Sequence, residues 1–172
     1  MNNGIFEAPW SRQLKWITAL SSALLLGIPL VILARTPQAE MAWRSGMVLL
    51  PLAILAACAF FAIRGYVIDS NALLICRPGW KTRISLQGLQ EVGADPKAMD
   101  GSIRVFGNGG LFCFAGLYRN SRLGRYRAFA TDQARAVVLK FPGRTLVVTP
   151  DDPQKFVAAL ENNKKTDRET ER

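Results

Sequence analysis

Residues 106–116 read FGNGGLFCFAG, and the glycines of this stretch decide how the chain folds around it. Glycine-rich loops can cradle a phosphate, but a P-loop needs a lysine after its last glycine, and the dinucleotide fingerprint needs GxGxxG opening a helix. The stretch has neither the lysine nor the third glycine, and strand-like runs flank it. We therefore expect Asn108, Gly109 and Gly110 to take positive φ in a hairpin turn or bulge, with no bound nucleotide or other cofactor.

Short runs with strand character lie on both sides of this stretch. In WKTRISL, residues 80–86, uncharged side chains alternate with Lys81, Arg83 and Ser85, which is the period of a strand that is buried on one face. Turn dipeptides such as Pro142-Gly143 separate neighbouring runs. The runs that predict strands are residues 65–70, 72–77, 80–86, 89–92, 103–107, 124–130, 134–140 and 144–150.

A helix is predicted after the last strand. Asp152 is a good N-cap, and Pro153 suits the first helical position. Apolar side chains at helical spacing then give one buried stripe, made by Phe156, Val157 and Leu160. From residue 162 the sequence is almost wholly polar and charged, which predicts a disordered tail over residues 162–172.

Two uncharged apolar runs precede the strands, at residues 16–34 and 45–63. Each has the roughly 20 residues that a helix needs to cross the hydrocarbon core of a bilayer. A buried hairpin of a soluble protein and a cleaved signal peptide are the alternatives, but the remaining chain is small for covering two such helices and no clear cleavage site follows the first run. We expect a transmembrane helical hairpin with a short connection.

The distribution of basic residues predicts the orientation of the hairpin. Lysine and arginine favour the cytoplasmic side of a membrane protein. The N-terminal segment and the connection have equal numbers of basic residues. The segment after the second run, on the same side as the N-terminal segment, adds Arg64, Arg77, Lys81 and Arg83. Both chain ends are therefore expected in the cytoplasm, and the odd number of three cysteines agrees with a reducing compartment.

A basic surface is the main candidate for binding. The chain has a net charge of +9, and a tethered basic domain is attracted to an anionic leaflet. The candidate surface for an anionic lipid or a protein partner consists of Lys81, Arg83, Arg119, Arg122, Arg125 and Arg127. Tyr118 and Tyr126 lie among these arginines and could sit at a lipid interface, although a solvated charged strand face is the simpler interpretation. Since no motif reads DNA or RNA, we expect no nucleic acid partner.

Catalysis is not expected. The chain has no histidine, which excludes triads and dyads that use imidazole. The adjacent Asp151 and Asp152 point apart at a helix cap, and no serine has a nucleophile-elbow context. Without histidine or a CxxC pair, the cysteines predict no metal site.

Several of these segments, taken in order, resemble the bacterial pleckstrin-homology (PH-like) domain family. The matching pieces are Tyr66-Val67-Ile68, Ile84, Val92, residues 106–110, Gly116, residues 123–126, residues 130–132, residues 149–153 and Phe156. The resemblance implies an α+β, mainly β fold, in which two nearly orthogonal antiparallel sheets form a barrel or sandwich closed by a C-terminal helix. Members often carry membrane helices ahead of the domain, which implies a multi-pass protein of the bacterial inner membrane. The first hairpin loop, residues 69–71, is acidic, unlike the basic loop with which eukaryotic relatives grip phosphoinositides.

The expected organisation is a short cytoplasmic segment (residues 1–15), a hairpin with helices at 16–34 and 45–63, a PH-like domain (64–161) and the tail. This predicts a membrane-anchored binding or scaffold module. In an alternative, the protein is an accessory subunit of a membrane complex and the hairpin makes the main contacts, because small residues let helices approach closely. These residues, which could equally pack within the hairpin, are Gly46, Ala53, Ala56 and Ala57.

Overall fold

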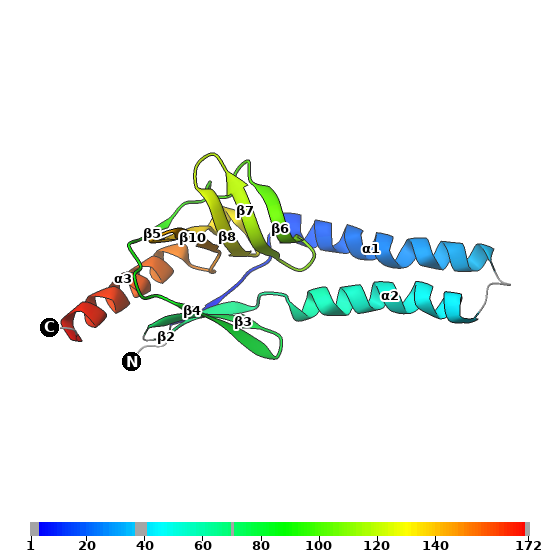
Figure 1. The fold of residues 1–172 in the computed structure, drawn as a ribbon, viewed down its shortest axis with the longest axis horizontal. Coiled ribbons are helices and arrows are strands. Elements are labelled where there is room, and N and C mark those ends of the chain that lie inside the picture. Colours follow the sequence, from blue (N-terminus) through cyan, green and yellow to red (C-terminus); the bar gives the residue numbers. More distant parts are fainter. Residues whose placement is uncertain (1–3, 37–40, 70, 171–172) are drawn as a thin grey trace.

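The computed structural model describes residues 4–36, 41–69 and 71–170 and shows a helical hairpin that projects from a β-rich part (Figure 1). Helices α1 (Arg12–Arg35) and α2 (Met41–Phe60) lie side by side, and residues 37–40 between them are outside the described range. Both helices are long and apolar enough to cross a membrane by length and composition, and only 6% of the apolar window of each is buried. A core helix of a soluble protein would be mostly buried, so these helices indicate membrane association.

The helix ends differ from the predicted limits of 16–34 and 45–63, because the base of the hairpin is part of the β-rich core. Helix α1 begins four residues earlier than expected, where the Ser11 hydroxyl accepts from the Leu14 amide at 3.0 Å. Leu14 is fully buried. Helix α2 ends at Phe60, and Ile63 beyond it is 1% exposed within the core. Leu14 and Ile63 are apolar because they pack in the protein core. Hydropathy alone does not distinguish a residue buried in the core from one that contacts lipid.

The strands form two sheets. The first has the order β1-β2-β3-β4, from β1 (Gly4–Glu7), β2 (Gly65–Asp69), β3 (Ala72–Arg77) and β4 (Trp80–Ser85). The second has the order β5-β9-β10-β8-β7-β6, from β5 (Glu91–Ala94), β6 (Ile103–Gly109), β7 (Phe114–Asn120), β8 (Gly124–Ala130), β9 (Val137–Phe141) and β10 (Arg144–Val148).

This sandwich of two open sheets, with helix α3 (Pro153–Thr170) at its C-terminus, confirms the predicted fold class. One pair departs from the antiparallel rule, since β10 runs parallel to β8. After β8 the chain passes through the short helix η1 (Gln133–Arg135) and forms β9, which is not adjacent to β8 in the sheet. It then returns as β10, which lies between β9 and β8. The turn at Pro142-Gly143 was predicted from the sequence, whereas the position of the β9–β10 hairpin relative to β8 was not.

Strand β1 was not predicted, because residues 1–15 were expected only as a short cytoplasmic segment. It pairs antiparallel with β2, with Glu7 opposite Gly65. The Ala8 amide continues the pairing by donating to the Arg64 carbonyl at 3.2 Å, and the Asp151 amide donates to the Glu7 carbonyl at 2.9 Å. The helical hairpin is therefore inserted between two strands that are neighbours in one sheet.

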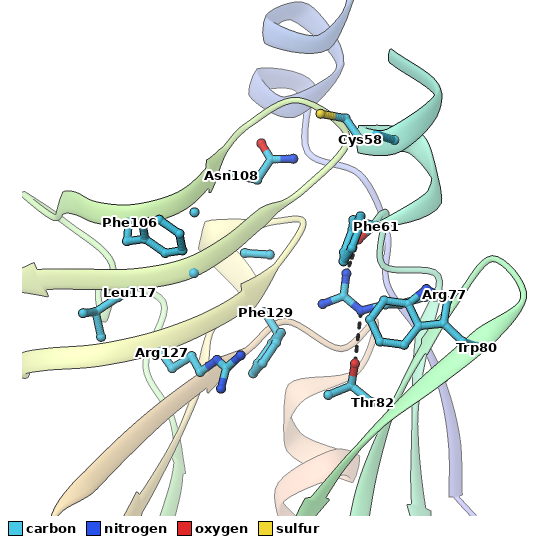
Figure 2. Close-up of a pocket in the computed structure, with 14 residues that line it drawn as sticks. Cys58, Phe61, Arg77, Trp80, Thr82, Phe106, Asn108, Leu117, Arg127 and Phe129 are labelled. Carbon is cyan, nitrogen blue, oxygen red and sulfur yellow. Dashed lines mark hydrogen bonds between the residues drawn. The ribbon is translucent and has the colours of Figure 1, made fainter. Parts of the chain in front are cut away.

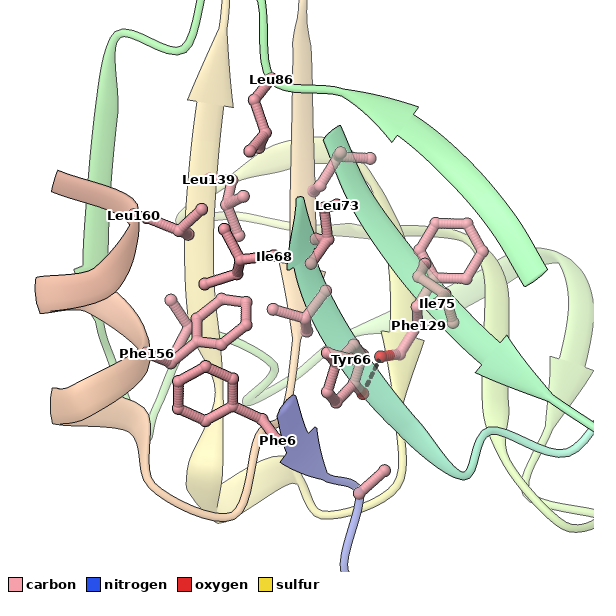
Figure 3. Close-up of a cluster of buried hydrophobic side chains, with 14 of the residues drawn as sticks. Phe6, Tyr66, Ile68, Leu73, Ile75, Leu86, Phe129, Leu139, Phe156 and Leu160 are labelled. Atoms are coloured by element: carbon pink, nitrogen blue, oxygen red, sulfur yellow. Dashed lines mark hydrogen bonds between the residues drawn. The ribbon is translucent and has the colours of Figure 1, made fainter. Parts of the chain in front are cut away.

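The larger core cluster joins both sheets and α3 (Figure 3). Phe156 of α3 is fully buried, with its ring 5.0 Å from that of Phe6 and 6.1 Å from that of Tyr66, both in edge-to-face geometry. The Tyr66 hydroxyl donates to the Phe129 carbonyl at 2.6 Å, which links β2 to β8 across the sandwich. Aromatic burial thus ties the N-terminal strand, the first sheet and the closing helix into one unit.

Helix α3 begins as predicted and ends later than predicted. The Asp152 carboxylate accepts from the Lys155 amide at 3.1 Å, as an N-cap does. Instead of fading at residue 162, the helix continues to Thr170, and residues 171–172 are outside the described range. Two polar contacts hold this extension against the sheets, from Asn163 to the Asp69 carbonyl (3.4 Å) and from Lys164 to the Gln90 carbonyl (2.7 Å).

Candidate functional site

The glycine-rich stretch forms the tip of the β6–β7 hairpin. Gly107 and Gly116 lie opposite each other in the ladder, with φ of 106° and 150°. A Cβ on either residue would overlap a backbone carbonyl of the facing strand, so the glycines permit a close approach of two backbones. Positive φ was expected at residues 108–110; of these only Gly110 has it, and Phe112 shows it as well.

The hairpin tip is docked on the base of α1. The Thr18 hydroxyl donates to the Gly110 carbonyl and accepts from the Phe112 amide, both at 3.1 Å. Trp10 packs edge-to-face on Phe112, with ring centroids 6.0 Å apart. The side-chain oxygen of Asn108 accepts from the amides of the next residues in the loop and fixes its shape. These contacts set the orientation of α1 relative to the six-stranded sheet.

A cavity of about 720 Å³ opens between the two sheets at the end of α2 (Figure 2). We refer to it as the inter-sheet cavity. One wall comes from the first sheet and the end of α2, and the other wall from β6, β7 and β8. Its lining is mostly apolar, with two guanidinium groups. The labelled side chains are Cys58, Phe61, Arg77, Trp80, Thr82, Phe106, Asn108, Leu117, Arg127 and Phe129.

A second hollow of about 460 Å³ shares Thr82, Leu117, Arg127 and Phe129 with the inter-sheet cavity, and it is more polar. Its lining includes arginines from three strands of the two sheets. We refer to this hollow as the basic groove, defined by Arg83, Arg125, Arg127 and Arg144. Within the part of the chain that the structure describes, none of these arginines has a carboxylate within 4 Å. The groove therefore presents uncompensated positive charge.

The structure separates the six predicted surface residues into two groups. Arg83, Arg125 and Arg127 come together in the basic groove. Lys81 is exposed on β4 outside both hollows, and Arg119 lies opposite Arg125 in the β7–β8 ladder without lining the groove. The guanidinium of Arg122 instead forms an ion pair with Asp95 at 3.0 Å.

Sequence reasoning missed Arg144 and Arg77 as members of the two hollows. Arg144 starts β10, where it donates to the Ser85 carbonyl at 3.1 Å and lies over the Phe141 ring. Arg77 ends β3 and is only 9% exposed. Arg77 was considered only for its charge after the second apolar run, because no local pattern marks an arginine as facing another sheet.

Tyr118 and Tyr126 do not lie at a lipid interface. They are 5% and 1% exposed, and their rings stack at 6.0 Å. The Tyr118 hydroxyl donates to the Asn108 carbonyl at 2.7 Å, and that of Tyr126 is bonded to the Ser102 hydroxyl at 2.6 Å. Desolvation on burial raises the pKa of Tyr118 to about 12 and also raises the pKa of Tyr126.

We expect the folded protein to show much less tyrosine ionisation at pH 10, the ordinary tyrosine pKa, than the unfolded chain. Burial raises the pKa of Tyr66 to about 12 as well, and Tyr66, Tyr118 and Tyr126 are the three tyrosines of the chain. Because the folded-state pKa values lie above the unfolded value, their contribution to stability is present below pH 10 and is lost as the pH rises towards 12. Absorbance at 295 nm, read before and after unfolding at pH 10.5, measures this. A full tyrosinate signal in the folded protein would contradict the buried positions.

Cysteines and acidic residues form no metal centre among the described residues 4–36, 41–69 and 71–170. Cys113 is fully buried, and burial raises the pKa of its thiol to about 11. The thiol donates weakly to the Phe61 carbonyl at 3.6 Å. These features are those of a small packed side chain rather than of a reactive nucleophile.

The two sheets and the closing helix have the architecture of a PH-like domain. The family model described as a bacterial PH domain matches residues 64–164, which is more than half of the chain. The chain therefore belongs to the bacterial PH domain family, as the resemblance in the sequence implied. No curated protein and no solved structure matches the chain. PH domains generally bind proteins or lipids and are not enzymes, so membership supports a binding role.

Proposed function

We propose that the chain is a multi-pass protein of the bacterial inner membrane that holds a PH-like binding module at the cytoplasmic face. Large apolar side chains are exposed on both helices, as lipid contact requires; they include Leu20, Leu24, Ile28, Leu49, Leu50 and Leu52. Since β1 pairs with β2, both ends of the hairpin enter the same sheet, which supports a common side for the two. The excess of basic residues after α2 supports the cytoplasm as that side.

The observation that carries the binding role is the basic groove. Four guanidinium groups line one hollow with no carboxylate partner among the described residues, and arginine favours planar, two-pronged contacts with carboxylates. The occupant that fits is an acidic segment of a protein partner. The membrane anchor would then serve to hold that partner at the bilayer surface.

Binding of a fluorescein-labelled oligoglutamate peptide to the full chain in phosphatidylcholine nanodiscs tests this role. Fluorescence anisotropy should show binding that weakens with added salt, because screening shortens the range of exposed charges. The double change Arg125→Glu and Arg144→Glu should weaken binding by about tenfold or more. Lys97→Glu with Lys155→Glu changes the net charge equally outside the groove and is the control. Equal losses in both double variants would show a general charge effect and contradict a defined site.

An accessory role through the hairpin is a second candidate, favoured by one observation. Gly46, Ala53, Ala56 and Ala57 are exposed rather than packed within the hairpin. Small exposed residues on a membrane helix suit close contact with a helix of another protein. Leucine at Ala53 and Ala56 should disrupt such a complex, detected by co-purification, while leaving oligoglutamate binding unchanged. Loss of peptide binding would instead indicate damage to the domain.

A further inference from the structure

The inter-sheet cavity contains a buried cation that the protein itself does not neutralise. Arg77 is 9% exposed, yet among the described residues no carboxylate lies within 4 Å of it. Its guanidinium donates through Nη1 to the Phe61 carbonyl and through Nε to the Thr82 hydroxyl at 3.3 Å, and both acceptors are neutral. A buried charge is costly unless it is paired.

The third nitrogen of this guanidinium is free to bind a ligand. No acceptor in the described part of the chain takes a hydrogen bond from Arg77 Nη2, and Figure 2 shows the group extending from β3 toward the opposite wall of the cavity. Burial lowers the pKa of Arg77, with repulsion by Arg127 adding to the effect. An anion in the cavity would offset both the desolvation of Arg77 and its repulsion by Arg127.

Arg127 supplies a second cation from the other wall. The guanidinium carbons of Arg77 and Arg127 lie 5.8 Å and 5.1 Å from the centre of the same ring, that of Phe129. The Phe129 ring lies between the two guanidinium groups in Figure 2, so both charges border the same end of the cavity. Two guanidinium groups from facing walls are suited to the several oxygens of a phosphate.

The rest of the cavity is apolar and begins where the membrane helix ends. Ala57 and Cys58, from the last turn of α2, belong to its lining. Exposed aromatic side chains surround the opening, with Phe61 at 49%, Trp80 at 37% and Phe106 at 79% exposure. Tryptophan is enriched at the level of the lipid headgroups, so Trp80 beside the end of α2 fits an opening at that level. The volume of about 720 Å³ is within the range typical of ligand sites, about 300–1,000 Å³.

We propose that the inter-sheet cavity binds one anionic phospholipid of the adjoining leaflet, with its phosphate on Arg77, attracted also by the charge of Arg127, and an acyl chain along the apolar walls beside α2. A hydrophilic acidic peptide would leave these walls unused, and inorganic phosphate would bury none of them. A lipid next to α2 can enter without leaving the bilayer. The site is separate from the acidic protein segment assigned to the basic groove, although Arg127 borders both.

Quenching of Trp80 fluorescence by brominated lipids tests the proposal, because Trp80 lines the cavity. The full chain, with Trp10, Trp16 and Trp43 changed to phenylalanine, is placed in mixed micelles. These contain either phosphatidylglycerol brominated on its acyl chain or equally brominated phosphatidylcholine. Half-maximal quenching should need about tenfold less phosphatidylglycerol than phosphatidylcholine. Both lipids carry a phosphate diester, but the choline cation of phosphatidylcholine is repelled by the two guanidinium groups, whereas phosphatidylglycerol has a net negative charge.

Arg77→Gln and Arg127→Gln should each reduce the preference for phosphatidylglycerol to about twofold or less. Glutamine retains a donor for the Phe61 carbonyl, and the exposed Arg127 has no described hydrogen bond to lose, so at least one variant is expected to fold as the parent does. Arg144→Gln removes the same charge from the basic groove outside the cavity and should leave the preference unchanged.

Three results would overturn the proposal. Equal quenching by both lipids in the parent would remove the anionic lipid site. Loss of the preference in Arg144→Gln, but not in Arg77→Gln or Arg127→Gln, would assign lipid binding to the basic groove. Abolition of the preference by millimolar inorganic phosphate would show that the phosphate group alone is recognised. Each of these results leaves oligoglutamate binding, and with it the proposed function, to be decided by its own assay.

Discussion

Replacing Gly116 with alanine should lower the free energy of unfolding of the β-rich part by about 3–5 kcal/mol. Gly116 has φ of 150° and faces Gly107 across the β6–β7 ladder. An added Cβ would overlap the Phe106 carbonyl oxygen, which belongs to the backbone and cannot rotate away. The strands must then separate, and the loop that docks on α1 would move with them. Thermal unfolding of the full chain in detergent, followed by near-UV circular dichroism, measures the loss.

Gly93→Ala is the matched control for this substitution. Gly93 also lies in a strand of the six-stranded sheet, but it has no positive φ, and no atom lies within 4 Å of the position of its Cβ. Its replacement should change stability by no more than about 0.5 kcal/mol. Similar melting temperatures for Gly116→Ala and the parent would contradict the close approach of β6 and β7.

Phe156→Ala should destabilise the protein by about 3–5 kcal/mol, because it removes a fully buried ring. The ring contacts Phe6 of β1 and Tyr66 of β2, so its loss opens a cavity where α3 closes the sandwich. We expect β1 to lose protection as well, since Phe6 of β1 packs against the Phe156 ring. Chemical unfolding gives the free energy, and hydrogen exchange at residues 4–7 reports on β1.

The exposed Gln154, two positions earlier on the same helix, provides the control. Gln154→Ala should be close to neutral, since an exposed helix position gains or loses only a few tenths of a kcal/mol. If exchange at residues 4–7 were unaffected by Phe156→Ala, β1 would be held by its backbone hydrogen bonds to β2 and Asp151. The aromatic cluster would then have a smaller role than its geometry indicates.

Local patterns predicted the elements whose stability is decided locally. Strand β8 matches the predicted run 124–130, and the N-cap Asp152 marked the start of α3. Strand β1 has only four residues, and its partner β2 follows the whole helical hairpin. Four residues of alternating polarity are too few to predict a strand from the sequence. Residues 4–7 are a strand because they pair with β2. The parallel pairing of β8 and β10 is likewise a result of sheet assembly rather than of either sequence.

In the candidate site as well, positions within one strand follow from the sequence, whereas contacts between distant strands do not. Arg125 and Arg127 line the same hollow, because residues at a spacing of two share one face of a strand. Arg122, close to them in sequence, turns away because the tight turn before β8 directs it to Asp95. Arg77 and Arg144 join the two hollows from strands far away in the chain. Whether residues of the two sheets face each other depends on how the sheets pack. The spacing of residues within one strand does not determine this packing.

The insertion of the helical hairpin between β1 and β2 has a mechanical consequence. A domain on a flexible linker would let its membrane helices tilt or rotate freely. Here the chain passes from paired strands directly into α1 and out of α2, and Thr18 and Arg77 fasten each helix base to a different sheet. For the proposed membrane-spanning hairpin, we expect a change in helix tilt to act on both sheets and to alter the distance between them. In that arrangement, we expect bilayer thickness to influence the width of the opening between the sheets.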